Sequence, residues 1–312
     1  MKDTKVLQNG LSNSQFLLLM FIMVVVWALA FPFIKIGLEE LSFINLTIMR
    51  LFVVCIVLLG ILLLQPRRFS KLHKKDVLPI FILGFFGVTV YHLGLNYGEQ
   101  FISPGAASLI IATIPVFIVV LAFVFLSERI GLKKLIGVIL ALCGVLMISI
   151  FGRQSSSIEV QYIFGALSVL IAAVMGAFYT IGGKKLLSRY TALSLTVYAM
   201  LLGSLGLIPF LSSSLFDQVA AMSFNSWFAV IFLGVFSTVV GYVLWYTALE
   251  VKTASEVGVY LYGVPVLSTI ISYLWFSDEI TLFFILGGVL VIVGLIIVNR
   301  GGRQRKGVKN GE

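Results

Sequence analysis

Apolar runs of about 20 residues, separated by short polar gaps, follow one another along the whole chain and constrain its fold most strongly. Of the 312 residues, 60% are apolar and 11% are charged, whereas an average soluble domain has about 25% charged residues. A helix of about 20 apolar residues crosses a bilayer core, so the pattern predicts an all-α integral membrane protein. The runs are continuous, which excludes the alternating strands of a membrane barrel. Ten transmembrane helices are predicted, at 16–38, 43–64, 77–98, 105–126, 132–151, 161–183, 193–211, 226–249, 257–276 and 281–299.

The positive charges indicate the orientation of these helices, because cytoplasmic loops carry an excess of Lys and Arg. With the N-terminus inside, 19 of the 22 Lys and Arg residues fall in cytoplasmic segments and only Arg153 falls in an outer loop. The remaining two, Lys35 and Arg50, lie within helices. We therefore expect a multi-pass protein of the plasma (inner) membrane with both termini in the cytoplasm and a basic cytoplasmic tail at 300–312.

The second half of the chain repeats the first at a distance of about 150 residues, and inverted repeats recur in membrane transporters. The aligned pairs include Pro115 with Pro265, Gly137 with Gly287, and Gly144 with Gly294. The predicted domains are a first repeat at 16–151 and a second at 161–299. Because each repeat holds five helices, an odd number, the second must be inverted, and we expect the two repeats to surround a central cavity.

Known motifs of catalysis, nucleotide binding and metal binding are not found in the sequence. G-x-x-x-x-G-K-[ST], H-E-x-x-H and G-x-S-x-G are missing, and Cys55 and Cys143 lack partners at metal-ligand spacing. The sequence therefore predicts a protein that is not an enzyme and has no cofactor and no metal. The net charge of +9 is confined almost wholly to the gaps between apolar runs, which argues against nucleic acid as a partner.

Polar side chains on the third and eighth helices predict a substrate cavity. His92, Asn96 and Glu99 follow one helical stripe, and the repeat aligns His92 with Tyr242 and Asn96 with Tyr246. Polar groups in hydrocarbon face the bundle or a cavity, so the equivalent faces of both halves are expected to line one. The alternative is that His92 and Asn96 only hold helices together through interhelical hydrogen bonds.

Prolines near the middle of the fourth and ninth helices predict helix breaks. Pro115 follows Thr113, and Pro265 follows Tyr260. A proline frees a backbone carbonyl, which is tolerated beside a neighbouring helix or a wet cavity. Thr113 and Tyr260 are therefore added to the predicted cavity lining, and the two prolines are gating candidates. A passive packing kink is the alternative.

Charged and titratable residues within the helices leave further questions open. His92 and Glu99 are the candidates for proton coupling, and uncoupled facilitation is the alternative. Lys35 lies near the outer end of the first helix, where its side chain can reach water. For Arg50, pairing with Glu39 or Glu40 is favoured over attraction of an anionic group from outside.

Taken together, these stretches resemble EamA-type permeases of the drug/metabolite transporter superfamily. The similar stretches contain W-A-L-A-F-P-F-I-K, A-S-L-I-I-A-T-I-P-V-F, F-L-S-E-R, Y-G-V-P-V-L and S-D-E-I, and they lie within 27–50, 98–128, 165–184 and 245–294. The resemblance implies a cavity between two halves, alternating access, and export of amino acids or other small metabolites.

The leading hypothesis is therefore a secondary transporter of small metabolites, with a small-molecule substrate and the lipid bilayer as its partners. A non-transporting membrane scaffold or sensor is the rival hypothesis. Whether the protein is a monomer or a homodimer stays open. The predicted substrate cavity is formed by His92, Asn96, Thr113, Tyr242, Tyr246 and Tyr260.

Overall fold

The structure, a computed structural model, describes residues 12–126, 131–151, 160–252, 254–278 and 280–300. The predictions for Arg153 and for residues 301–312 of the tail lie outside these ranges. The elements within them run in the order α1 (Asn13–Leu38), α2 (Phe43–Leu64), η2 (Pro66–Arg68), α3 (Lys74–Gly84), η3 (Phe85–Val90), α4 (Tyr91–Glu99), α5 (Pro104–Ile111), α6 (Ile114–Leu126), α7 (Leu132–Phe151), α8 (Val160–Leu186), α9 (Ala192–Ser204), η4 (Leu205–Phe210), α10 (Ser214–Ala221), α11 (Phe224–Ile231), η5 (Phe232–Val240), α12 (Gly241–Val251), α13 (Ala254–Gly258), η6 (Val259–Tyr262), α14 (Gly263–Phe276) and α15 (Leu282–Arg300).

Several of these elements join into longer helical spans. In the described part of the chain, nine helical stretches are long and apolar enough to cross a membrane, and Leu282–Val298 is a shorter apolar helix. The all-helical membrane class is thus confirmed, while the count of ten spans stays a prediction. The nine stretches are Asn13–Leu38, Phe43–Leu64, Lys74–Glu99, Pro104–Leu121, Leu132–Phe151, Val160–Leu186, Ala192–Phe210, Phe224–Val251 and Glu256–Phe276.

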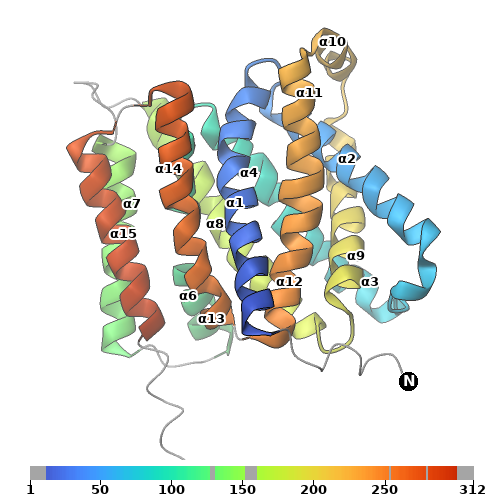
Figure 1. The fold of residues 1–312 in the computed structure, drawn as a ribbon, viewed down its shortest axis with the longest axis horizontal. Helices are drawn as coiled ribbons and strands as arrows, with labels where there is room; N and C mark the ends of the chain where they lie inside the picture. Colours follow the sequence, from blue (N-terminus) through green and yellow to red (C-terminus); the bar gives the residue numbers. More distant parts are fainter. Residues whose placement is uncertain (1–11, 127–130, 152–159, 253, 279, 301–312) are drawn as a thin grey trace, which may run out of the picture.

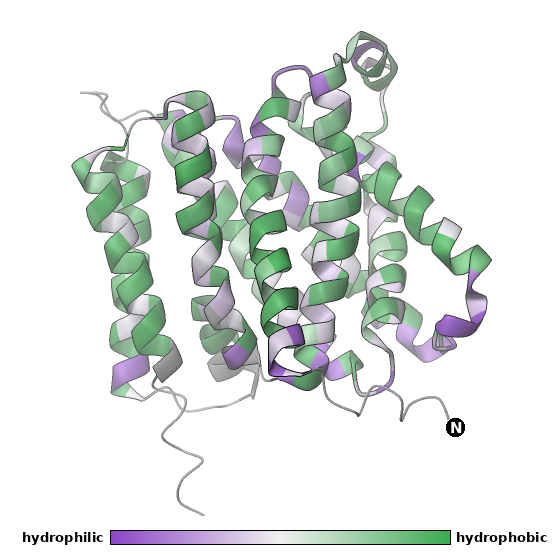
Figure 2. Ribbon diagram, viewed as in Figure 1, coloured by the Kyte–Doolittle hydropathy of each residue, from purple (hydrophilic) through white to green (hydrophobic). Residues whose placement is uncertain are grey.

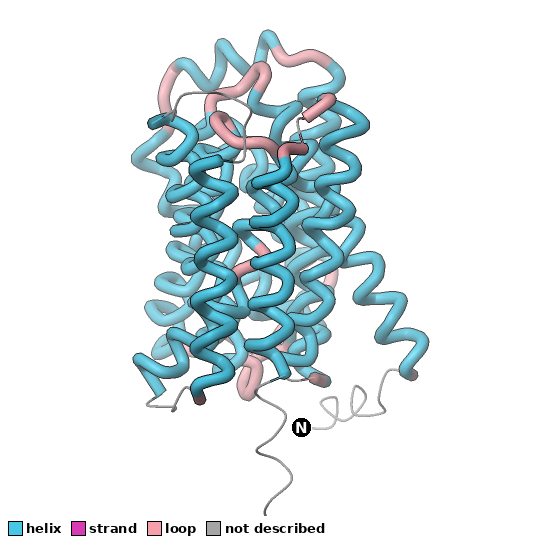
Figure 3. The backbone as a smooth tube through the Cα atoms, turned by 90° about the vertical axis from the view of Figure 1, so that its left-hand side faces the viewer, coloured by secondary structure: helices cyan, strands magenta, loops and turns pink. Residues whose placement is uncertain are grey.

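The helices pack side by side along a common direction, with loops gathered at the two ends of the bundle (Figures 1 and 3). Apolar residues cover the length of the helices, whereas the polar residues concentrate towards the ends (Figure 2). Large apolar side chains face outwards, as shown by Leu63 and Leu274, which are 77% and 70% exposed. A surface of this kind is stable against lipid and would promote aggregation in water.

Hydroxyl side chains begin many of the spans. Ser42, Ser103, Thr191 and Ser223 are the N-caps of α2, α5, α9 and α11, and each side chain accepts a hydrogen bond from a backbone N–H of the first turn. Without such a cap, the first N–H groups of a helix have no intrahelical partner. These short capped turns allow successive spans to reverse direction within a few residues.

Glycines bring α7 and α15 into backbone contact at one edge of the bundle (Figure 1). A methyl group added to Gly137 would lie 2.6 Å from the carbonyl oxygen of Gly294, and one added to Gly144 would lie 2.5 Å from that of Gly287. Residue numbers rise along α7 as those of its contacts on α15 fall, so the two helices run antiparallel. Small residues of this kind allow close helix packing in a membrane, where burial of apolar surface gives little driving force.

Candidate functional site

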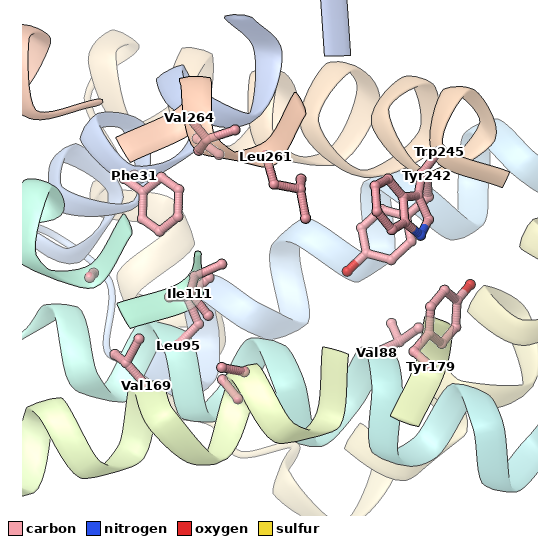
Figure 4. Packing of buried hydrophobic residues seen from close by; sticks show 14 of the residues in the cluster. Phe31, Val88, Leu95, Ile111, Val169, Tyr179, Tyr242, Trp245, Leu261 and Val264 are labelled. Carbon is pink, nitrogen blue, oxygen red and sulfur yellow. The ribbon is translucent and has the colours of Figure 1, made fainter. Parts of the chain in front are cut away.

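A cavity lies in the middle of the bundle and takes its walls from both halves of the chain. It has about 80 Å³ of space for the centres of water-sized molecules, compared with the roughly 10–15 Å³ that a single water requires. Apolar and aromatic side chains from distant parts of the sequence face this space in Figure 4. The cavity is lined by Trp27, Ala30, Phe31, Arg50, Gly87, Tyr91, Leu95, Ser108, Ile111, Ala112, Ile114, Gly176, Tyr179, Thr180, Ser237, Tyr242, Trp245, Leu261 and Val264.

Four aromatic side chains form a continuous wall at one end of the cavity. The ring of Trp27 lies edge-on to Tyr242 at 5.9 Å and at 5.5 Å from Trp245, and Tyr179 lies edge-on to Tyr242 at 5.5 Å. Such ring pairs add about 0.5–1.5 kcal/mol each beyond burial. The wall is therefore a rigid apolar surface with phenol and indole groups at its edges.

Two π-helical segments interrupt the spans beside the cavity. η3 contributes Gly87 to the lining and η5 contributes Ser237. A π-helical turn shifts the backbone hydrogen-bond register and leaves carbonyl groups that need other donors. Trp27 Nε1 donates to the carbonyl oxygen of Ser237 at 3.0 Å, and Thr238 Oγ1 donates to that of Leu233 at 2.7 Å. Side chains thus stabilise the irregular backbone that shapes this wall.

Arg50 brings a guanidinium group into the cavity from α2. The side chain is buried, and its Nε donates to Thr238 Oγ1 at 2.8 Å while Nη2 donates to Ser237 Oγ at 3.0 Å. Nη1 has no hydrogen-bond partner among the described residues. The pairing with Glu39 or Glu40 favoured by the sequence is not what the structure shows, since Glu40 Oε2 instead accepts from the backbone N–H of Ser223 at 2.7 Å.

The six residues predicted to line the cavity occupy two layers. Tyr242 lines the cavity itself. Tyr246 is buried behind it, with its ring stacked on Tyr179 at 5.2 Å and its hydroxyl donating to the carbonyl oxygen of Tyr179 at 3.3 Å. His92 is also buried, 6.2 Å from the ring of Tyr242, and its Nδ1 donates to the carbonyl oxygen of Val88 at 2.6 Å. His92 Nε2 has no partner in the described part of the chain.

The other three predicted residues are not among the lining residues either. Asn96 Nδ2 donates to Thr47 Oγ1 at 2.8 Å, a hydrogen bond between two spans. Thr113 Oγ1 donates to the carbonyl oxygen of Ile110 at 2.6 Å, beside the lining residue Ala112. Tyr260 packs edge-on against Phe16 at 5.8 Å. A role for these residues in substrate binding stays a prediction.

Both prolines lie at interruptions in their spans. The helix is broken at Ala112 and Thr113, and Pro115 is the second residue of α6. Pro265 is the third residue of α14, and α14 begins directly after the 3₁₀ segment η6. Lining residues lie at both interruptions, at Ala112 and Ile114 in one span and at Leu261 and Val264 in the other.

Glu99 is a buried carboxylate outside the cavity lining. Neither carboxylate oxygen has a hydrogen-bond partner among the described residues. The half-buried Lys35 donates from Nζ to the backbone carbonyl of Glu99 at 3.5 Å. Lys35 and Glu99 therefore meet at the end of α4, although they are far apart in the sequence.

Sequence reasoning missed the hydroxyl groups of the cavity. Ser108, Thr180 and Ser237 line it, and Thr238 holds Arg50 from behind. The adjacent Ser237 and Thr238 in the middle of an apolar run indicate such a site, because small hydroxyl residues in a spanning helix mark helix contacts or polar cavities. The π-helical segment η5, which carries Ser237 and Thr238, leaves no pattern in a single sequence.

The apolar spans, the exposed apolar side chains and the internal cavity define this chain as a multi-pass membrane protein. Comparison with known proteins identifies its family. The chain belongs to the EamA-like transporter family, whose model matches residues 15–150 and 163–300.

Its relatives carry transporter names. It is 38% identical to an uncharacterized transporter of Archaeoglobus fulgidus, over 88% of this chain and 95% of that protein. It is 32% identical to a probable terminal-alkyne amino-acid exporter of Streptantibioticus cattleyicolor, over 91% of this chain and 93% of that protein. A solved structure with 17% identity and a TM-score of 0.58 covers 90% of this chain and 96% of that one, which shows a shared fold.

Proposed function

We propose that this protein is a secondary transporter of the plasma membrane that exports small metabolites, such as amino acids or related solutes, by alternating access. The observation that carries the proposal is the cavity, which lies at the centre of a membrane bundle and is walled by both halves of the chain. The amino-acid exporter among the relatives supports this class of cargo. A cavity shared by two halves is the arrangement that allows them to rock around a fixed site.

An inverted relation between the halves is supported by the α7–α15 contact. The repeat aligns Gly137 with Gly287 and Gly144 with Gly294, whereas the contacts join Gly137 to Gly294 and Gly144 to Gly287. Exchanging the halves therefore maps this contact onto itself, as a two-fold axis would. The π-helical segments η3 and η5 occupy equivalent places in the third and eighth spans, which agrees with the same symmetry.

In this proposal the two layers around the cavity share the work of binding. Tyr242 contacts the solute, and His92, Asn96, Thr113, Tyr246 and Tyr260 supply polar groups as the helices shift between states. Pro115 and Pro265 mark the breaks at which such shifts are absorbed, since a broken helix bends at lower cost than a continuous one.

For coupling, we propose that His92 and Glu99 carry the proton in an antiport cycle. Each is buried and has polar atoms without a hydrogen-bond partner among the described residues, so each has capacity for an added proton. Uncoupled facilitation is the competing mechanism, and it predicts that an imposed pH gradient leaves the export rate unchanged.

The first test uses cells that lack similar carriers and express the full chain, with exported metabolites compared by untargeted mass spectrometry. The wild-type protein should enrich particular solutes outside the cells. Each of His92→Ala, Asn96→Ala and Tyr246→Ala should lower this export severalfold at equal expression, because each leaves a buried polar partner unsatisfied or opens a gap beside the cavity.

The matched control is Gly60→Ala in α2, where an added methyl group would meet nothing within 4 Å. It should export at the wild-type rate. If all three alanine variants also do so while well expressed, the assignment of these residues is wrong. A scaffold or sensor would show no solute flux in proteoliposomes under any imposed gradient.

A further inference from the structure

Arg50 has more hydrogen-bonding capacity than the protein uses. Its side chain is 3% exposed and lines the cavity, so the group without a partner is deeply buried. Nη2 donates a hydrogen bond to the Ser237 hydroxyl and Nε donates one to the Thr238 hydroxyl. These two hydrogen bonds fix the plane of the guanidinium. Nη1 keeps its N–H groups free among the described residues. A long side chain held at two points with a third donor free is preorganised for a ligand.

The charge of Arg50 also lacks a counterpart in the cavity. The other polar lining residues are hydroxyl groups or indoles, and no lining residue carries a carboxylate. Glu99, a buried carboxylate outside the lining, interacts electrostatically with Arg50 but makes no hydrogen bond to it. A buried guanidinium with no anion in hydrogen-bond contact is costly, and a ligand carboxylate placed beside it removes much of that cost.

The remaining wall selects for the body of the ligand. Trp27, Phe31, Tyr179, Tyr242 and Trp245 surround the space with aromatic surface. A single guanidinium balances one negative charge, and a second charge would face apolar rings without compensation. The same argument disfavours an ammonium group, which would add a cation beside Arg50.

We propose that the cavity binds a small organic monoanion whose carboxylate accepts hydrogen bonds from Arg50 Nη1 and whose apolar body packs on the aromatic wall. The inference rests on the proposed transport function and narrows its cargo, within the small metabolites named there, to apolar monocarboxylates. It thereby disfavours zwitterionic amino acids, which that proposal included. Ser237 and Thr238 are positioning residues, which hold the guanidinium without touching the ligand's charge.

The test measures binding to the purified full chain by the rise in its unfolding temperature and by isothermal titration. Four probes share a phenyl ring and differ in their polar group. They are 3-phenylpropionate, its neutral amide, phenylalanine as a zwitterion, and phenyl phosphate, whose anionic group is a phosphate in place of a carboxylate. 3-Phenylpropionate should bind at least about tenfold more tightly than the amide, as expected for a charge-assisted hydrogen bond. The phosphate and the zwitterion should bind more weakly than the carboxylate.

Variants then connect this preference to Arg50. Arg50→Gln should lose the difference between acid and amide, Arg50→Lys should keep part of it, and Ser237→Ala should reduce it. Gly60→Ala should bind as the wild type does. Retention of the acid preference in Arg50→Gln, equal binding of acid and amide by the wild type, or tighter binding of the phosphate or the zwitterion would each overturn the proposal. If Arg50→Gln does not fold, the proposal is tested by two other results: the preference of the wild type for acid over amide, and the reduction of that preference in Ser237→Ala.

Flux measurements separate this inference from the transport proposal. In proteoliposomes, uptake of labelled 3-phenylpropionate against the same unlabelled acid inside should depend on Arg50. Carboxylate binding without flux of any solute would contradict the transport function and leave the binding site standing. Flux confined to neutral or cationic solutes would contradict the carboxylate site and leave transport standing.

Discussion

Asp76 joins the start of the third span to the turn between α8 and α9. The side chain of Asp76 is 3% exposed, and its carboxylate accepts a hydrogen bond from Tyr190 Oη at 2.8 Å and pairs with Arg189 Nη1 at 2.8 Å. Tyr190 Oη in turn accepts from the backbone N–H of His73 at 3.1 Å. Because Arg189 is 41% exposed in its side chain, water screens the ion pair, and the buried hydrogen bond is the larger contribution.

Replacing Asp76 with Ala should lower the free energy of unfolding by about 1–3 kcal/mol, because the Tyr190 hydroxyl loses its acceptor in a buried place. Asp76→Asn should cost less, since the amide oxygen still accepts this hydrogen bond. Thermal unfolding of the purified protein in detergent measures both. Asp217→Ala, at an exposed position of α10, is the control and should leave the unfolding temperature unchanged. An equal response of Asp76→Ala and Asp217→Ala would show that the buried cluster contributes no stability.

Single residues show how far the sequence can be interpreted. Arg50 was recognisable as exceptional because it stands in an apolar run, where a charge is costly. The hydrogen-bond partners of Arg50 could not be recognised from the sequence, since Thr238 lies 188 residues away and no local spacing connects it with Arg50. Glu40 was the nearest acid in the chain, but it bonds to the Ser223 backbone instead. Proximity in sequence predicts contacts within a helix and says little about contacts between spans.

At the scale of helices and turns, hydropathy predicted the spans closely because burial in lipid depends on composition summed over about 20 residues. The third span, predicted at 77–98, begins earlier, at Lys74. The side chains of Lys74 and Lys75 are exposed and Asp76 is held by protein partners, so the hydropathy signal does not include this first turn. Prolines predicted the breaks before Pro115 and Pro265. The π-helical segments η3 and η5 were not predicted, because they depend on one-residue shifts in backbone hydrogen bonding that tertiary contacts stabilise.

The α7–α15 contact makes a prediction at this same scale. Gly144→Ala places a methyl group 2.5 Å from the Gly287 carbonyl oxygen and 2.8 Å from the backbone nitrogen of Val291. Both are backbone atoms of α15, which leave little room for adjustment. We expect a loss of about 1–3 kcal/mol from overpacking, measured as a lower unfolding temperature. Gly60→Ala, with open space around it, should be neutral or slightly stabilising because Ala favours the helix. If the two variants unfold at the same temperature, the helices are not in backbone contact.

Across the whole molecule, the repeat predicted a cavity between the third and eighth spans. Both contribute lining residues, Tyr91 from α4 and Tyr242 from α12 among them. Other walls come from α1, α2, α5, α8 and α14, which the alignment of equivalent residues could not indicate. A repeat pairs positions by symmetry, whereas a cavity is enclosed by whichever side chains the packing brings together.

The orientation of the whole bundle can be tested with single cysteines. In a background without Cys55 and Cys143, a cysteine replaces either Arg68 or Asp217, which are both exposed at the ends of the bundle. The excess of Lys and Arg in alternate loops predicts that position 68 faces the cytoplasm and position 217 the outside. A membrane-impermeant thiol reagent added to intact cells should therefore label position 217 alone, and both positions should react after the cells are opened. Labelling of both positions in intact cells would contradict the inverted arrangement of the two halves on which alternating access depends. Labelling of position 68 alone would leave that arrangement standing and contradict the predicted orientation of the bundle.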